Sequence, residues 1–279
     1  MTLYNPEHTK KYYNEYADKE TERWNTSIVE QVKLYIHNHY LKKHIAPGDK
    51  VLELGAGTGI FTEPLSEVSG TLVVTDLSPV QLEINRSRAH KLGYSDQVDS
   101  WELADICDLS QFEEESFDKI VCYGGPLSYV FDKRDEALSE IRRVLRPNGT
   151  ALLSVMNLWG TVDQVLEPIL QTVSEDDNSK IIASGNLHPS SHAVSDHHCH
   201  LFRAESLRET FQNNAFEIIT LSASNCLATK RADALEVLEQ DPEKWQHFLN
   251  LEIQACVSPG MVESGTHMIA VIKRTESTS

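Results

Sequence analysis

The sequence has no apolar run approaching the roughly 20 residues that are needed to cross a bilayer. Its first 20 residues also lack the apolar core of a signal peptide. Cysteines are few and odd in number, and no two of them form a CxxC pair: Cys107, Cys122, Cys199, Cys226 and Cys256. This pattern disfavours a disulfide framework and favours a reducing compartment. We therefore expect a soluble cytoplasmic protein with no membrane partner.

Positive charge is scarce as well. Lys and Arg number 25 against 42 Asp and Glu, which gives a formal net charge of −17 over 279 residues. A chain of this charge repels phosphate backbones unless it carries a local basic patch. The densest basic stretch, Arg142, Arg143 and Arg146, is interleaved with apolar residues. The sequence therefore disfavours nucleic acid as a partner.

Apolar runs and helical segments alternate along the first half of the chain. A helix is expected to begin after Ser78, with Pro79 at its first position, and to end near Gly93. Short apolar runs that read as buried strands cover residues 50–54, 71–75, 98–104, 119–123 and 150–155. Five strands joined by helical segments predict an α/β fold with a doubly wound, mostly parallel sheet.

The flanking segments predict additions to this core within a single domain. Residues 10–42 are expected to form two helices, the second starting at Ser27 with Glu30 completing a capping box. The alternation is then interrupted by a helix over 162–173, an acidic polar stretch over 174–180 and a histidine-rich loop. It resumes with a helix over 204–213 and a strand over 216–223. A helical stretch over 232–256 separates that strand from the last one, over 267–273. We expect an N-terminal helical cover (1–45), a cofactor-binding core (46–156), an inserted helical and loop cap (157–203) and a C-terminal part of the sheet with a helical insertion (204–279).

A glycine-rich turn follows the first expected strand. Gly55, Gly57 and Gly59 alternate with other residues there, and Asp76 lies 21 residues beyond Gly55, at the end of the second strand. Glycines allow close backbone approach to a ligand, and an acid at this spacing can accept ribose hydroxyls. The dinucleotide fingerprint requires a third glycine where Ile60 stands, and the Glu53 carboxylate would repel a pyrophosphate. An adenosine-containing ligand other than a nicotinamide cofactor is therefore expected.

The run Glu53-Leu54-Gly55-Ala56-Gly57-Thr58-Gly59 resembles motif I of the class I S-adenosylmethionine-dependent methyltransferases. The resemblance covers residues 45–156 densely and continues through Asp76-Leu77-Ser78, Ala104-Asp105-Ile106, the start of the fourth strand at 117–121 and the stretch 143–149. It implies a Rossmann-like sheet of seven strands, the last of them antiparallel, and S-adenosylmethionine as the cofactor.

The resemblance also assigns roles to matching residues. The loop residues Gly55, Ala56, Gly57 and Gly59 would face the methionine part of the cofactor, and Glu53 would help to shape the loop. Asp76 would hold the ribose, Leu77 would pack on the adenine, and Asp105 with Ile106 would contact the adenine edge. Further candidates are Tyr123 at the end of strand four and, if the N-terminal helices close over the cofactor rather than forming ordinary core, Tyr13, Tyr16 and Trp24.

The sequence gives fewer indications of the residues that would bind or activate the methyl acceptor. Strand four ends in Tyr123-Gly124-Gly125-Pro126-Leu127, which lacks the Asn or Asp before two prolines that DNA amino-methyltransferases carry. Five of the twelve histidines fall within residues 188–200. They could form a solvated loop, an active-site cover that presents an imidazole base, or a metal site, although their spacing matches no standard zinc finger. We predict no metal site here and take His197, His198 and His200 as candidate catalytic residues.

These observations predict methyl transfer from S-adenosylmethionine to a small-molecule acceptor by in-line displacement under a cap. The alternatives are a non-catalytic cofactor-binding module and a methyltransferase that acts on a protein, for which the acidic surface suits only a basic partner. The acceptor atom and the oligomeric state are left open.

Overall fold

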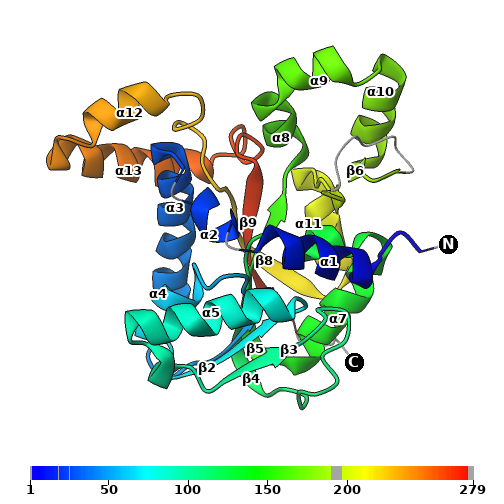
Figure 1. The fold of residues 1–279 in the computed structure, drawn as a ribbon, viewed down its shortest axis with the longest axis vertical. Coiled ribbons are helices and arrows are strands. Elements are labelled where there is room, and N and C mark those ends of the chain that lie inside the picture. Colours follow the sequence, from blue (N-terminus) through cyan, green and yellow to red (C-terminus); the bar gives the residue numbers. More distant parts are fainter. Residues whose placement is uncertain (1, 18, 25, 190–196, 276–279) are drawn as a thin grey trace.

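The computed structural model describes residues 2–17, 19–24, 26–189 and 197–275. A seven-stranded sheet forms its centre, with strands in the order β3-β2-β1-β4-β5-β9-β8 (Figure 1). Strands β1 to β5 run parallel, and β9 is antiparallel to both of its neighbours. The predicted doubly wound, Rossmann-like sheet is therefore confirmed. The strands are β1 (Lys50–Leu54), β2 (Thr71–Asp76), β3 (Ser100–Leu103), β4 (Phe117–Cys122), β5 (Leu145–Met156), β8 (Phe216–Ala223) and β9 (His267–Arg274).

Helices cover both faces of the sheet. Neighbouring residues of β1 point to opposite sides, so that Val51 packs against the layer of α3 to α5, α12 and α13, whereas Leu52 packs against the layer of α7 and α11. The helices are α1 (Pro6–Tyr16), α2 (Lys19–Arg23), α3 (Ile28–His44), α4 (Thr62–Val68), α5 (Pro79–Leu92), α6 (Pro126–Tyr129), α7 (Arg134–Val144), α8 (Leu158–Gln164), α9 (Leu166–Thr172), α10 (Glu175–Ser184), α11 (Ala204–Asn213), α12 (Ala232–Leu238) and α13 (Pro242–Cys256).

Capping residues define several helix ends where the sequence predicted them. The Ser27 hydroxyl accepts a hydrogen bond from Glu30 N at 3.3 Å, and the Ser78 hydroxyl accepts one from Gln81 N at 3.1 Å. Gly93 ends α5 in the left-handed conformation, with φ +82°. The N-terminal segment nevertheless forms three helices rather than two.

The added segments contain more regular structure than expected. The acidic stretch at 174–180 lies within α10, whose first turn is capped by Ser174, and the single helix expected at 162–173 is divided into α8 and α9. The helical stretch at 232–256 is interrupted because Asp241 caps a new helix, α13, that has Pro242 at its first position. Strand β5 begins at Leu145, before the apolar run at 150–155 from which it was predicted.

The two helical additions lie at the carboxyl-end edge of the sheet. Helices α8 to α10 follow β5, and α12 and α13 follow β8, so that two separate groups of helices project from one end of the molecule (Figure 1). A short antiparallel pair, β6 (Asn186–Leu187) with β7 (Cys199–His200), joins the first group to α11. Among the residues that the structure describes, no helix is long and apolar enough to span a membrane.

Candidate functional site

A pocket opens at the carboxyl ends of β1, β2 and β4, where the strand order reverses between β1 and β4. It encloses about 900 Å³, including space open to solvent. The structure brings together ten of the predicted cofactor residues as lining: Tyr13, Trp24, Gly55, Ala56, Gly57, Asp76, Leu77, Asp105, Ile106 and Tyr123. The lining does not include Glu53, Gly59 and Tyr16, which lie behind or beside it.

The glycine loop adopts a conformation that side chains oppose. Gly55, Gly57 and Gly59 have φ values of +66°, +55° and +89°. A Cβ on Gly55 would lie 2.4 Å from Pro126 Cγ, and one on Gly59 would lie 3.0 Å from the Asn85 side chain. The loop therefore requires glycine for its backbone angles and, at Gly55 and Gly59, for its close packing.

Asp76 holds the loop from the end of β2. One carboxylate oxygen accepts a hydrogen bond from Gly57 N at 2.8 Å, and the other accepts one from Ser78 N at 2.7 Å. Burial raises the pKa of Asp76 to about 6, so the carboxylate is largely ionised at neutral pH. This group faces the pocket as a strong acceptor, which is the chemistry needed to hold a diol.

Glu53 lies beneath the loop rather than in the pocket. Its carboxyl accepts a hydrogen bond from Thr62 Oγ1 at 2.7 Å, and the same Thr62 oxygen accepts one from Asn85 Nδ2 at 2.8 Å. Burial raises the pKa of Glu53 to about 8. The group is therefore neutral at pH 7, and charge repulsion at this position was the wrong reason to disfavour a pyrophosphate. The geometry instead supports a role in shaping the loop.

Asp105 carries a contact that sequence reasoning missed. Its Oδ2 accepts a hydrogen bond from the Tyr4 hydroxyl at 2.8 Å, and its Oδ1 accepts one from Cys107 N at 2.9 Å. Burial and the neighbouring carboxylate raise the pKa of Tyr4, so the hydroxyl remains a donor. Tyr4 also lines the pocket. The segment before α1 thus covers the end of the pocket at which Asp105 lies.

The first two helices are fastened over the pocket by the start of α5. Gln81 Nε2 donates hydrogen bonds to the carbonyl oxygens of Tyr13 and Ala17, at 2.9 and 3.2 Å. The Ser78 hydroxyl donates to Asn14 Oδ1 at 2.6 Å. The sequence marked Ser78 only as the residue before a helix, and it did not reveal the bonds of Gln81. Their side chains in fact join the cover to the core.

The cover presents aromatic and charged side chains to the pocket. Tyr13 from α1 lines it together with Glu20 and Trp24, whose indole nitrogen donates to a Glu20 oxygen at 3.2 Å. The Tyr16 ring instead stacks on Tyr12, with ring centroids 5.8 Å apart. Tyr13 and Trp24 are thus placed to contact a ligand, whereas Tyr16 supports the helix.

The three candidate histidines lie in three different environments. The His197 Nε2 lies 3.1 Å from the hydroxyl of Tyr129, which lines the pocket and accepts a 2.6 Å hydrogen bond from the Tyr13 hydroxyl. The His198 ring stacks on His8 outside the pocket, at 4.1 Å between centroids. His200 is buried, and its Nδ1 lies 2.7 Å from Asn186 Oδ1.

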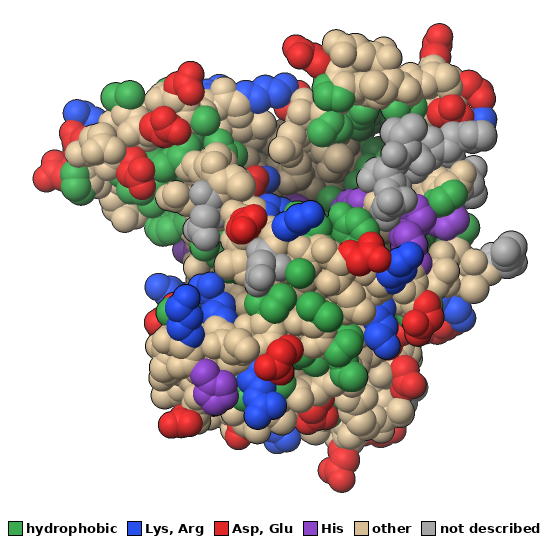
Figure 2. All heavy atoms as spheres, viewed as in Figure 1, with side chains coloured by type: hydrophobic (Ala, Val, Ile, Leu, Met, Phe, Trp, Pro, Cys, Tyr) green, Lys and Arg blue, Asp and Glu red, His purple; other side chains and the backbone are tan. Residues whose placement is uncertain are grey.

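His197 is therefore the candidate that adjoins the pocket, through Tyr129. Burial lowers the pKa of His197 to about 4, so its imidazole is neutral at pH 7 and can accept a hydrogen bond, but it is a weak base. Figure 2 shows other histidine side chains gathered on the surface beside α1 and β6. His192 lies outside the described residues.

Residues 51–149 match a family model described as a methyltransferase domain. This match, together with the methyltransferase relatives and solved structures, supports a class I, S-adenosylmethionine-dependent methyltransferase domain over these residues. The chain is 32% identical over 133 residues to the methyltransferase GfsG of Streptomyces halstedii, and the aligned residues make up 47% of this chain and 46% of that protein. It is 33% identical over 116 residues to the ubiquinone/menaquinone biosynthesis C-methyltransferase UbiE of Hahella chejuensis, covering 40% and 45%. The chain thus spans about half the length of the curated relatives it matches.

Solved structures share the fold at low sequence identity. A methyltransferase from Haloferax volcanii, solved with the activator Trm112, superposes with a TM-score of 0.63 at 17% identity and covers 97% of this chain and 99% of that one. A Haemonchus contortus N-methyltransferase, solved with phosphomonomethylethanolamine and S-adenosylhomocysteine, superposes with a TM-score of 0.53 at 19% identity. The match covers 86% of this chain and 52% of that one. The [4+2]-cyclase SpnF superposes with a TM-score of 0.55 at 16% identity, and the match covers 87% of this chain and 80% of that one. The fold of this domain therefore serves more than one reaction.

The pocket residues fit the cofactor of this domain class. The hydroxyls of Thr58 and Tyr123 are buried at the pocket and have no hydrogen-bond partner among the described residues. A polar ligand that reached either hydroxyl would supply its missing partner. Asp76 and Asp105 supply the acceptors for hydroxyl and amino groups.

Proposed function

We propose that the protein binds S-adenosylmethionine in this pocket and catalyses transfer of its methyl group to a small-molecule acceptor. The observation that carries this proposal is the position of α1 and α2, which cover the carboxyl-end pocket and are tied to the core through Gln81. An enclosed pocket with apolar walls suits a small ligand better than a protein segment. The family match supports the chemistry, and the cover supports the class of acceptor.

The cofactor would supply a methyl group on a positively charged sulfur. The glycine loop would lie against its amino-acid part, with Asp76 accepting from the ribose hydroxyls and Asp105 from the adenine amino group. Asp76 and Asp105 bring two carboxylates to this pocket, which favours a cationic ligand, whereas the Glu20 carboxylate is paired with Arg23. Holding donor and acceptor in line can contribute up to roughly 7–11 kcal/mol in ideal cases, so the protein needs little further catalytic machinery.

An acceptor that carries a hydroxyl, a thiol or a protonated amine must also lose a proton. A relay from the acceptor through the Tyr129 hydroxyl to Nε2 of His197 would take up that proton, and the lowered pKa of the buried imidazole makes it a weak base in this role. General base assistance of this kind is typically worth about 10²–10⁴-fold. His198 and His200 do not reach the pocket, and we assign the proton-transfer role to Tyr129 and His197 only.

The test is product formation from tritiated S-adenosylmethionine with a cell extract divided into low-mass and protein fractions. We expect S-adenosylhomocysteine to form with the low-mass fraction, and Tyr129→Phe to reduce the rate about 10–100-fold without changing cofactor affinity. Tyr35→Phe, on α3 and away from the pocket lining, is the matched control.

Two other results would replace the proposal. Label in the protein fraction alone would identify a protein methyltransferase, and binding without turnover in either fraction would identify a cofactor-binding module. An equal rate for Tyr129→Phe and the wild type would remove the proton-transfer role while leaving the methyl transfer in place.

A further inference from the structure

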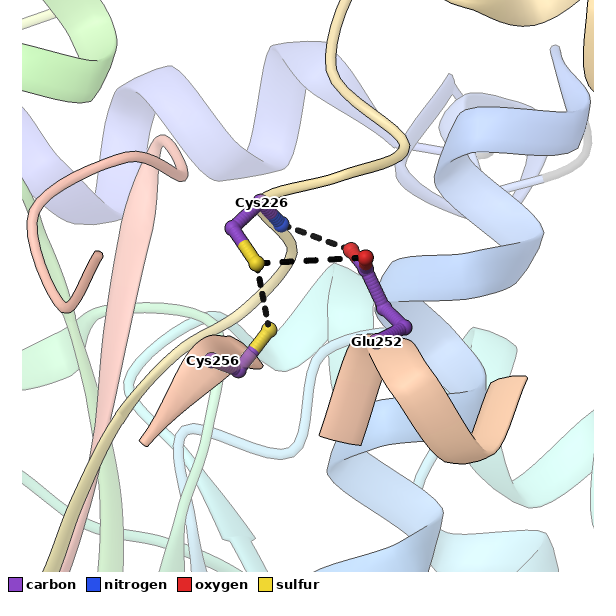
Figure 3. Close-up of side chains that lie close together, drawn as sticks. All are labelled: Cys226, Glu252 and Cys256. Carbon is purple, nitrogen blue, oxygen red and sulfur yellow. Dashed lines mark hydrogen bonds between the residues drawn. The ribbon is translucent and has the colours of Figure 1, made fainter. Parts of the chain in front are cut away.

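Three metal-ligating side chains meet far from the pocket, near the carboxyl end of β8. Cys226 belongs to the segment that follows β8, and Glu252 and Cys256 lie four residues apart on α13. That spacing places the last two on one face of the helix. All three are buried, and their side chains point toward one another (Figure 3).

The distances between the ligand atoms are close to those found around a tetrahedral metal ion. The two sulfur atoms are 3.6 Å apart, Cys226 Sγ lies 3.8 Å from Glu252 Oε2, and all three ligand atoms fall within 4.8 Å of one another. A tetrahedral zinc ion with Zn–S of about 2.3 Å and Zn–O of about 2.1 Å requires S–S and S–O separations of about 3.8 and 3.6 Å. The observed separations of Cys226 from its two partners agree with these values within a few tenths of an ångström.

The carboxylate is already oriented by the surrounding backbone. Glu252 Oε1 accepts a hydrogen bond from Cys226 N at 2.6 Å, and Oε2 accepts one from Leu227 N at 2.8 Å. Outer-shell bonds of this kind fix the direction of a ligand and are a regular part of metal sites. Oε1 also accepts a longer hydrogen bond from Ala228 N at 3.4 Å, and Oε2 accepts one from the Cys226 thiol, whose proton a metal ion would replace.

The charge of this carboxylate also lacks a counterpart. Glu252 is fully buried, and no salt bridge to Lys or Arg is found for it within the described part of the chain. The carboxyl group is stabilised instead by the backbone N–H groups of Cys226, Leu227 and Ala228. A divalent ion between the carboxylate and two thiolates would supply the missing positive charge.

An approach from solvent exists on one side. Cys226 lines a second surface cavity together with polar residues of neighbouring segments, among them Asp163, Thr229 and Ser264. This cavity gives an ion a route to the sulfur and gives a water molecule room to act as a fourth ligand.

We propose that Cys226, Glu252 and Cys256 bind a zinc ion, with the fourth coordination position directed toward this cavity. Binding replaces the two thiol protons, which pass to solvent, and forms two Zn–S bonds and one Zn–O bond. Thiolate ligands select zinc over calcium or magnesium. The ion would join α13 to the end of β8, outside the pocket lined by the glycine loop.

The test uses the purified full-length chain, first stripped of metal with a chelator and then titrated with Zn²⁺ and with Co²⁺. We expect one ion per chain, and for Co²⁺ the charge-transfer absorption of two thiolate ligands. Cys226→Ala and Cys256→Ala should each weaken Zn²⁺ binding at least 100-fold. Cys122→Ala, a buried cysteine of β4, is the control and should bind as the wild type does.

The cobalt spectrum of the unmodified chain keeps the test independent of how well the variants fold. Absence of thiolate-to-cobalt absorption, or zinc retained by both Cys226→Ala and Cys256→Ala, would overturn the proposal. Loss of two free thiols and about 2 Da on air oxidation, with no metal bound at any stage, would also overturn it and would identify a disulfide-forming pair instead. S-adenosylmethionine titration of the same samples separates this result from that for the pocket.

Discussion

At the scale of single residues, the glycines of the loop are not equivalent. Gly55 combines φ +66° with a Cβ position 2.4 Å from Pro126 Cγ, whereas a Cβ on Gly260 would meet no atom within 4 Å. We expect Gly55→Ala to lower the melting temperature by roughly 5–10 °C and to abolish measurable cofactor binding, since backbone strain and overpacking add. Gly260→Ala should change neither. Scanning calorimetry and cofactor titration of both variants check this, and a Gly55→Ala protein that binds normally would contradict it.

Asp76 is the residue whose charge the proposed binding mode depends on most. Asp76→Asn retains the size of the side chain but loses a charged acceptor, and we expect the dissociation constant for S-adenosylmethionine to rise at least 10-fold. Asp96→Asn, in the exposed turn after α5, is the control and should bind normally.

The raised pKa of Asp76, about 6, gives the same residue a pH signature. If the ionised carboxylate binds the ribose, protonation removes the better acceptor. Affinity should therefore fall as pH drops below about 6, approaching a 10-fold loss per pH unit. The Asp76→Asn variant should lack this dependence. A wild-type affinity that stays constant from pH 5 to pH 8 would show that this carboxylate does not hold the cofactor.

The site residues that could be predicted from the sequence are those that directly follow the end of an expected strand. Asp76 and Asp105 could be predicted because each follows a buried apolar run, and parallel strands bring their carboxyl ends to one edge. Tyr4 could not, because its partner Asp105 lies 101 residues away and no local pattern marks the contact. Among the histidines, only the folded chain places His197 next to Tyr129 and turns His200 toward Asn186.

At the scale of elements, α1 depends on α5 for its position over the pocket. Gln81 is fully buried and donates to two carbonyl oxygens at the end of α1. We expect Gln81→Ala to increase amide exchange across residues 6–16 and to raise the cofactor dissociation constant about 10-fold, while exchange in β1 and β4 stays unchanged. Exposed Gln97→Ala is the control. Unchanged exchange in α1 would mean that other contacts hold the cover.

Helix starts could be predicted where a capping residue directly precedes a segment with helical periodicity, as at Ser27 and Ser78. The same signals were present but not used elsewhere. Ser174 caps α10 inside an acidic polar stretch to which no helix was assigned, and Asp241 with Pro242 divides the segment at 232–256. The β6 and β7 pairing has no such signal, because each strand contributes only two residues and their pairing depends on the chain between them.

At the scale of the whole molecule, the proton held by Glu53 links folding to pH. Its folded pKa of about 8 exceeds that of the unfolded chain, near 4.5, so the folded state retains a proton that the unfolded state releases. Stability from this group is complete below about pH 4.5 and is lost as pH rises toward 8, by up to about 1.4 kcal/mol per pH unit. Asp76 acts with the same sign over a lower range.

Glu53→Gln keeps an acceptor for Thr62 and removes the titration. We expect the free energy of unfolding of this variant to fall less between pH 5.5 and pH 8 than that of the wild type, and to equal or exceed it at pH 8. Urea unfolding at the two pH values measures this, with exposed Glu67→Gln as the matched control. Parallel pH profiles for Glu53→Gln and the wild type would mean that Glu53 is ionised in the folded protein.

The additions after β5 and β8 lie outside the part of the chain that matches the family model, which ends at residue 149. They border the same edge of the sheet as the pocket, and they carry both the histidine cluster and the three buried ligands on α13 and its partner loop. The match within residues 51–149 concerns the cofactor, so the features that distinguish this protein from its relatives are to be sought in these additions.

Calorimetric titration with S-adenosylmethionine, with its demethylated product and with NAD tests the central claim most directly. We predict one site per chain, micromolar affinity for both sulfur compounds and no heat with NAD. Binding of NAD, or no binding of either sulfur compound to folded protein, would contradict the assignment of the glycine loop, Asp76 and Asp105 to this cofactor.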